Sequence, residues 1–371
     1  MKKILNKIFK ILIIIFFLFI GFCVGLLFGS QLSRGSDGIA RLFELIGSLF
    51  LAYNLVIIIH EGGHLVFGLL TGYKFSSFRI WSFMMIKQNG KMRFRRFSLA
   101  GTGGQCLMIP PEKGDTKASV ILYNLGGVIF NFILTVLCLL IYFLIPETYF
   151  LSTTLWYTAI LSVFTMISNG IPFNVGGIAN DGMNARHLSK NPDAAESFRK
   201  QLLVNASQTE GARISEMPEE WFTLPEGADM KNVHCASLAV FAVQRILDSG
   251  DIVAAERAIT ELLDSDYNVI GLYRNLLTCD LIYCRLSIDP TADVTDLITP
   301  ELKKLMQSMK NYPSIIRTQY VIALLVDKDQ VAAEKIMAGF DKQTAKFPYP
   351  QEVACEKAAM LEILEKSKNA I

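Results

Sequence analysis

Residues 42–70 read LFELIGSLFLAYNLVIIIHEGGHLVFGLL, an apolar stretch long enough to cross a bilayer as a helix. Residues 60–64 of this stretch form the pattern H-E-x-x-H. Positions i and i+4 lie on one face of a helix, so His60 and His64 can both reach one metal ion. Glu61 lies between them and is placed to act as a general base. The stretch therefore predicts a membrane helix that carries a metal site.

An alternative interpretation is that these polar residues only mark the end of the helix near the lipid headgroups. Residues that anchor a helix at that depth are usually Lys, Arg, Trp or Tyr rather than His or Glu. Ionisable side chains inside an apolar span are costly in lipid and are usually functional. We therefore favour the metal site.

Composition supports a membrane protein. The chain has 371 residues, of which 51% are hydrophobic, and its mean hydropathy is +0.36. The net charge of +2, with no basic stripe, argues against nucleic acid as a partner. The apolar runs lie in the first half, and the remainder is typical of a soluble helical domain. We expect an N-terminal anchor with a short external loop at 1–41, a membrane core at 42–185 and a helical domain at 186–371.

Four segments are long and apolar enough to span a bilayer, at 11–29, 42–70, 118–145 and 149–173. The first could instead be a cleaved signal peptide. Its length and the lack of a small-residue cleavage site after it favour a retained anchor. The sequence therefore predicts about four transmembrane helices.

Loop charges predict the orientation of these spans. The loop at 71–117 holds nine basic and two acidic residues, and the N-terminus is also basic. The short loop after residue 145 holds Glu147 and no base. Because positive loops stay on the cytoplasmic side, we expect both termini and the 71–117 loop in the cytoplasm.

A catalytic zinc site needs three protein ligands and one open position, so a third ligand must come from elsewhere in the chain. Asp181 follows the span at 149–173, at the same predicted membrane depth as His60 and His64. An aspartate in a Gly/Asn-rich stretch can also be a turn former or a helix N-cap. The histidines opposite it favour the ligand interpretation.

Two motifs together resemble the site-2 protease family of intramembrane metalloproteases. The first is the H-E-x-x-H of residues 60–64, and the second is N-x-x-P followed by D-G, at residues 169–172 and 181–182. The resemblance covers about residues 42–185. It implies a three-helix catalytic core in which His60, His64 and Asp181 bind one Zn²⁺ ion and Glu61 is the general base.

The gap between the two halves of the second motif is longer here than is common in that family. Residues 176–180 provide the extra length, and Asp193 is the weaker substitute for Asp181 as ligand. Asn131 and Asn169 match the family's asparagine positions and are candidates for substrate binding. For Asn131, a packing role between helices is equally open.

The basic loop contains a second structural signal. Residues 85–94 include Asn-Gly at 89–90, which is typical of a β-hairpin. Such a hairpin could pair with an unwound substrate by strand addition. The alternative is an amphipathic basic loop that lies on anionic headgroups.

The region after residue 186 shows helical periodicity and no catalytic constellation. Helices are expected at 233–249, 251–265, 267–286, 314–326 and 329–341. The sequence DIVAAER at 251–257 recurs as DQVAAEK at 329–335, similar to tetratricopeptide-type hairpins, although a generic helical bundle is also compatible. The predicted fold class is an all-α membrane protein with a cytoplasmic helical domain, which could bind a regulatory protein.

The predicted function is hydrolysis of peptide bonds in membrane-spanning or membrane-tethered proteins, in a bacterial cell membrane, during regulated intramembrane proteolysis. The main alternative is a catalytically inactive membrane scaffold of the same fold, which intact site residues argue against. A metal transporter is a third possibility. It is disfavoured because the spans carry no second set of carboxylates or histidines.

Overall fold

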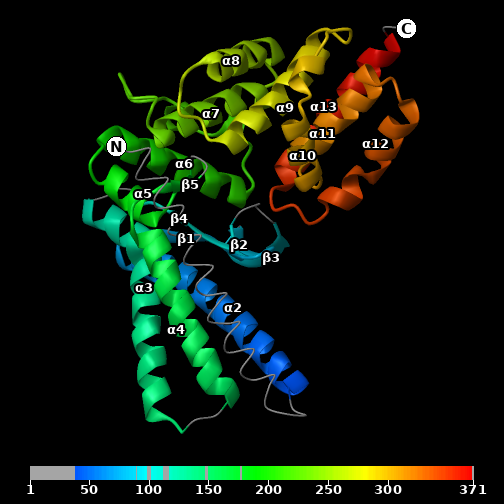
Figure 1. Cartoon of the computed structure of the whole chain (residues 1–371). Coiled ribbons are helices and arrows are strands. Elements are labelled where there is room, and N and C mark those ends of the chain that lie inside the picture. Colours follow the sequence, from blue (N-terminus) through cyan, green and yellow to red (C-terminus); the bar gives the residue numbers. More distant parts are fainter. Residues whose placement is uncertain are drawn as a thin grey trace. The chain divides into compact units, whose positions relative to one another are not determined.

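The computed structural model describes residues 38–88, 90–97, 102–111, 117–146, 149–175 and 178–369. The predicted span at 11–29 lies outside them. Within these residues the chain is mostly helical, with one four-stranded sheet and one two-stranded pair (Figure 1). The contacts group the chain into two units, and the continuous helix α2 runs from one into the other. The first unit contains residues 38–63, 125–173 and 179–183 of the described chain, and the second contains the rest.

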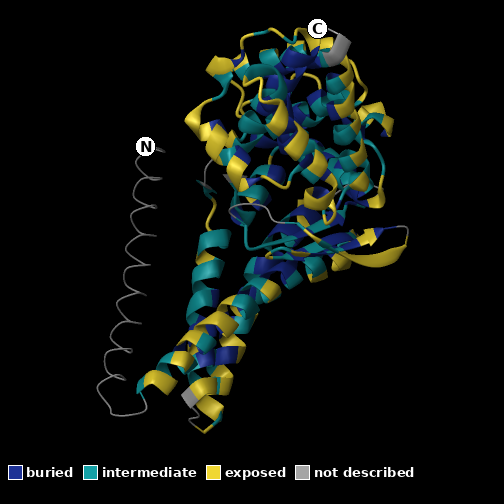
Figure 2. Ribbon diagram, turned by 90° about the vertical axis from the view of Figure 1, so that its right-hand side faces the viewer, coloured by how far each residue is buried: buried dark blue, intermediate teal, exposed yellow. Residues whose placement is uncertain are grey.

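Three helices of the described chain are long and apolar enough to cross a membrane: α2 (Gly38–Leu70), α3 (Lys117–Leu144) and α4 (Tyr149–Gly170). They coincide with three of the predicted spans. Large apolar side chains stay exposed along them, as the yellow segments of Figure 2 show. Large apolar side chains such as Phe143, which is 75% exposed, are unfavourable in water and are suited to contact with lipid.

Small and hydroxyl residues join these helices within the first unit. Ser162 on α4 donates to the backbone oxygen of Asn131 on α3 at 2.9 Å, and both residues are fully buried. Ser48 on α2 donates to the backbone oxygen of Phe150 on α4 at 3.3 Å. Such contacts are typical of helix association in lipid, where apolar burial between helices brings little gain.

Most of the described chain is helical, as predicted, but the second unit also contains a small sheet, so the fold is not all-α. Its strand order is β3-β2-β1-β4, and every neighbouring pair is antiparallel. The strands are β1 (Lys74–Ile80), β2 (Phe83–Gln88), β3 (Lys91–Arg96) and β4 (Gly104–Ile109). Alternate residues are buried along two of the strands: Met84 and Ile86 on β2, and Cys106 and Met108 on β4, each at 7% exposure or less.

The hairpin predicted at 85–94 is confirmed as β2 and β3, which pair from Phe83 opposite Arg96 to Gln88 opposite Lys91. Gly90 follows β2 with φ of +72°, a conformation that glycine adopts without strain. β3 is the edge strand of the sheet. The short strands β5 (Asn174–Val175) and β6 (Ile178–Ala179) form a separate pair.

The chain continues as a series of helices: α5 (Asp181–Leu188), α6 (Pro192–Glu210), α7 (Val233–Asp248), α8 (Ile252–Asp264), α9 (Gly271–Ile288), α10 (Pro300–Ser308), α11 (Pro313–Val321), α12 (Gln330–Thr344) and α13 (Pro350–Asn369). The five helices predicted after residue 232 are confirmed, although α10 and α13 were not expected. α6 begins at Pro192 with Asn191 as its N-cap, and Asp193 lies in its first turn.

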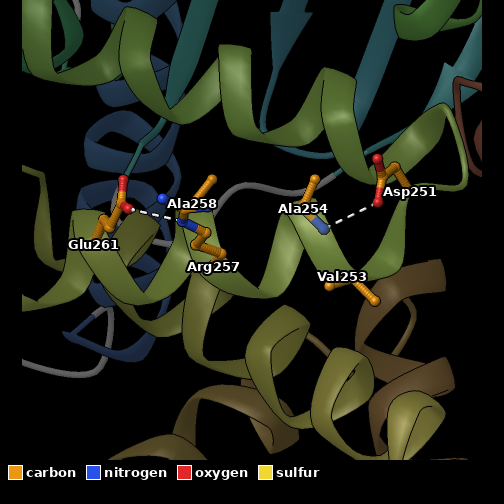
Figure 3. A pocket seen from close by; sticks show the side chains of 6 residues that line it. All are labelled: Asp251, Val253, Ala254, Arg257, Ala258 and Glu261. Carbon is orange, nitrogen blue, oxygen red and sulfur yellow. Dashed lines mark hydrogen bonds and ion pairs between the residues drawn. The ribbon is translucent and has the colours of Figure 1, made fainter.

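The repeated sequence at 251–257 and 329–335 marks two equivalent helix starts. Asp251 accepts a hydrogen bond from the Ala254 amide at 3.0 Å, as Figure 3 shows, and Asp329 accepts one from Ala332 at 2.9 Å. The next alanine of each copy is buried, at 2% exposure or less. The repeat therefore encodes an N-cap and a close packing position for α8 and α12.

Candidate metal centre

His60 and His64 lie one helical turn apart on α2, which keeps an unbroken helix through the H-E-x-x-H pattern. His60, Glu61 and His64 are each no more than 9% exposed. The helix therefore presents three ionisable side chains, all nearly excluded from solvent, within one turn. This is the arrangement that the spacing predicts.

Asp181 is the first residue of α5, and its Oδ2 lies 3.1 Å from Nε2 of His60. The candidate ligand atoms of His60, His64 and Asp181 all lie within 4.8 Å of one another. Two ligands that each sit about 2.0–2.1 Å from a tetrahedral zinc ion are roughly 3.3 Å apart. The distance between His60 and Asp181 is close to this value, and the donor set of two imidazoles and a carboxylate is compatible with zinc.

Asn180 fixes the start of α5 against the end of α4. Its Oδ1 caps the helix by accepting from the Met183 amide at 2.9 Å. Its Nδ2 donates to the backbone oxygens of Ser168 at 2.8 Å and Ile171 at 2.7 Å. Because Asp181 is the next residue, this clamp determines where its carboxylate lies. Asn180 was not predicted from the sequence, although Asn before Asp-Gly is a recognisable capping signal.

Glycines allow the backbones around the site to approach closely. A Cβ at Gly63 would lie 2.6 Å from the carbonyl carbon of Gly126 on α3, and one at Gly182 would lie 2.8 Å from that of Gly170. A Cβ at Gly127 would lie 2.6 Å from the imidazole of His60. Only glycine therefore fits at these positions.

Hydrogen bonds orient both imidazoles. Nδ1 of His64 lies 2.8 Å from the backbone oxygen of Tyr123. A carbonyl oxygen can only accept, so Nδ1 carries the proton and the Nε2 lone pair is left for a metal.

Nδ2 of Asn131 lies 3.2 Å from Nδ1 of His60, and Oδ1 of Asn131 has no partner among the described residues. The nitrogen and oxygen of a side-chain amide exchange places when the amide turns over. With its oxygen toward His60, the amide accepts the Nδ1 proton, which leaves the Nε2 lone pair facing Asp181. Asn131 is fully buried. This position favours orientation of the His60 ring as the role of Asn131. The sequence had left substrate binding and helix packing open.

Removal of the Asn131 side chain should therefore weaken zinc binding. We expect Asn131→Ala to lower zinc affinity about 10- to 100-fold, as is typical for loss of a group that orients a metal-binding histidine. Competition with a chromogenic chelator measures this affinity. Asn124→Ala is the matched control, because Asn124 is also buried on α3 but donates only to Val120 of its own helix. Equal affinities in the two variants would contradict the role of Asn131.

The structure places the remaining predicted residues as follows. Asn169 is half-buried at the end of α4 and donates its amide to Thr165 of the same helix at 3.1 Å. Asp193 lies in the first turn of α6 and does not belong to the metal-ligating group found among the described residues. Substrate binding by Asn169 and Asn131 stays a prediction.

Comparison with known proteins agrees with this geometry. The model of peptidase family M50 matches residues 48–345, well over half of the chain. No curated protein and no solved structure matched the chain. The family is that of the site-2 proteases, which confirms the resemblance found in the sequence motifs, and its members are zinc metalloproteases. This chain, with its apolar helices, is thus a membrane protein that belongs to peptidase family M50.

Proposed function

We propose that the protein is an intramembrane zinc endopeptidase that hydrolyses peptide bonds of membrane-spanning or membrane-tethered proteins. One observation carries the proposal: the ligand group of His60, His64 and Asp181 within 4.8 Å, with Glu61 beside it. His60, Glu61 and His64 are buried on α2, a helix suited to lipid, and the half-buried Asp181 approaches them from α5. Intramembrane ionisable groups of this kind are usually functional.

Each residue has a role in the proposed reaction. His60, His64 and Asp181 would hold zinc, which when bound supplies a Lewis acid that acidifies water and polarises a carbonyl. Glu61 accepts a proton from the attacking water as the bond from oxygen to the carbonyl carbon forms. It then donates that proton to the leaving amine as the C–N bond breaks. Asn131 and Asn169 are candidates for contact with the substrate.

The edge strand β3 could present the substrate. A transmembrane helix satisfies its own backbone hydrogen bonds, so it must be unwound before hydrolysis. Within the described residues β3 pairs with a strand on one side only, which suits it to receive an extended segment, and its Phe94 is 78% exposed. Basic residues alternate with the apolar ones, at Lys91, Arg93 and Arg95. Binding of β3 to anionic headgroups is therefore the alternative use.

Loop charges support a placement with both termini in the cytoplasm of a bacterial cell. The helices after α6 would then be cytoplasmic and available to a regulatory protein. In this arrangement the protein would act in regulated intramembrane proteolysis, after another event makes the substrate accessible.

The proposal is tested by reconstituting the purified protein in liposomes with a panel of single-span proteins. We expect cleavage within or at the edge of the apolar span, as located by mass spectrometry of the products. A zinc chelator should abolish this cleavage and added zinc should restore it. Zinc-loaded protein that cuts no member of the panel would favour the inactive scaffold instead.

A further inference from the structure

A cavity of about 730 Å³ lies in the second unit, lined by residues of α7, α9, α11 and α13 and by Phe97, which follows β3. This volume falls within the range of small-ligand pockets, roughly 300–1,000 Å³. The hollow along α8 in Figure 3 is different, because its Arg257 and Glu261 are 82% and 70% exposed and pair with each other. Only the larger cavity has buried polar groups on its wall.

A buried ion network forms one wall of this cavity. Arg317 on α11 is 2% exposed and contacts Asp280 of α9 at 2.5 Å and Glu356 of α13 at 2.9 Å. Gln244 of α7 donates to the other oxygen of Asp280 at 2.6 Å. The Arg317 guanidinium also lies 4.2 Å from the ring centre of Tyr283. The two carboxylates of this network already share one cation.

Two further acceptors on the wall lack donors. Glu352 lies one turn before Glu356 on α13, and no hydrogen bond or ion pair engages its carboxylate within the described part of the chain. Oε1 of Gln351 is inaccessible to solvent and also has no described partner. The Gln351 amide cannot simply turn over, because its Nε2 donates to the backbone oxygens of Gln208 at 2.7 Å and Ala212 at 3.3 Å. Glu352 is half-buried, so its carboxylate is open to a donor that enters the cavity, whereas the Gln351 oxygen is closed off from it.

The charges around Glu352 also favour the entry of a cation into the cavity. Burial raises its pKa to about 8, and the nearby carboxylates of Glu356 and Asp280 add to this effect while Arg317 opposes it. Asp248, at the end of α7, adds a smaller effect of the same sign. Glu352 is therefore mainly protonated at neutral pH, and an entering cation would favour its ionised form.

An aromatic cluster completes the wall. The ring centre of Phe97 lies 5.5 Å from that of Tyr312, 5.9 Å from Phe347 and 6.3 Å from Tyr349. All four residues line the cavity. Aromatic faces next to a carboxylate are suited to a planar cation, and guanidinium stacks on them more readily than ammonium does.

We propose that this cavity binds the arginine side chain of a peptide segment from a partner protein. Guanidinium offers its N–H donors in a planar fork that matches the two oxygens of the Glu352 carboxylate, and its plane can stack on the aromatic cluster. The cavity volume admits the side chain together with part of its backbone. This site does not depend on the proposed hydrolytic activity, and it gives a defined chemistry to the partner expected at the helical domain.

The test uses the full-length protein in detergent and fluorescence anisotropy of labelled glycine–serine peptides. One peptide carries a central arginine, and the other carries citrulline, which has nearly the same shape but no charge. We expect the citrulline peptide to bind wild type on the order of tenfold more weakly. Glu352→Gln should weaken arginine-peptide binding by a similar factor. Glu365→Gln, on the exposed side of α13, should bind both peptides as wild type does.

The pH dependence gives a second readout. Below pH 8 the arginine must displace a proton from Glu352, so its affinity should rise with pH from 6 to 8. Glu356, whose pKa burial raises to about 7, ionises over the same range and adds to the rise, whereas Tyr312 and Tyr349, whose pKa values are also raised by burial, stay neutral. This rise should be reduced in Glu352→Gln. Equal binding of the two peptides by wild type, or binding of neither, would overturn the proposal. If Glu352→Gln did not fold, as judged by thermal unfolding, the peptide comparison in wild type would still decide.

Discussion

Replacement of Glu61 by glutamine is expected to lower the rate of substrate cleavage by about 100- to 10,000-fold, the usual contribution of a general base. Glutamine keeps the shape of the side chain but cannot accept a proton from water. Because Glu61 is not one of the three metal-ligating residues, the zinc content should not change. Single-turnover cleavage in liposomes and metal analysis of the same samples measure both quantities.

Glu44→Gln is the matched control for this variant. Glu44 lies on the same membrane helix, 17 positions before Glu61, which is roughly 25 Å along an α-helix. Its replacement should leave both cleavage and zinc content unchanged. Undiminished cleavage by Glu61→Gln would remove Glu61 from the mechanism, and loss of zinc from that variant would show that Glu61 also has a structural role at the metal.

The second large effect is expected at Gly63. An alanine Cβ there would collide with the Gly126 backbone of α3, and backbone cannot move aside as a flexible side chain can. α2 and α3 would have to separate, and His60 would shift relative to Asp181. A displacement of about 1 Å at a catalytic centre can cost on the order of 100-fold in rate, so we expect a loss of this size in Gly63→Ala.

Gly62 provides a control at the next position of the same helix. A Cβ at Gly62 meets nothing within 4 Å, so Gly62→Ala should keep its activity and gain about 1 kcal/mol of helix propensity. Cleavage rates and thermal unfolding of the two variants measure the difference. If both alanine variants were equally active, or equally inactive, the close approach of α2 and α3 at Gly63 would not be what the site requires.

Much of the membrane part could be predicted from the sequence because lipid imposes simple rules. Three predicted spans coincide with α2, α3 and α4, since a span needs about 20 apolar residues and shows as a continuous run. The spacing of His60 and His64 follows directly from helix geometry. Asp181 was harder to place, because its approach to His60 depends on the turn after α4 rather than on periodicity.

The sheet could be predicted only at its hairpin. β1 includes an irregularity between Phe75 and Ser77, so adjacent residues Ser76 and Ser77 are both buried and no strict alternation marks the strand. Arg79 resembles a loop charge in the sequence, yet it is 1% exposed. Its two terminal nitrogens donate to the Trp81 backbone oxygen and to Thr102. At the irregularity of β1 and at Arg79, contacts with residues distant in the sequence outweigh the local preference for strand or loop structure.

The sequence singled out Asn131 but did not show its contact with His60. Asn131 and Gly127 both act on the His60 ring, from a helix more than 60 residues further along the chain. Only the packing of α3 against α2 shows this. In the helical domain, by contrast, the two N-caps at Asp251 and Asp329 are local, and the repeat around them was visible in the sequence.

The central claim is that His60, His64 and Asp181 hold zinc, and metal analysis of three purified proteins tests it most directly. We expect one zinc ion per chain in wild type and in Asp193→Ala, and a large loss of zinc in Asp181→Ala. Asp193 is the informative control because it is the other carboxylate that the sequence offers as third ligand. Zinc absent from wild type, or retained by Asp181→Ala but lost from Asp193→Ala, would contradict this account.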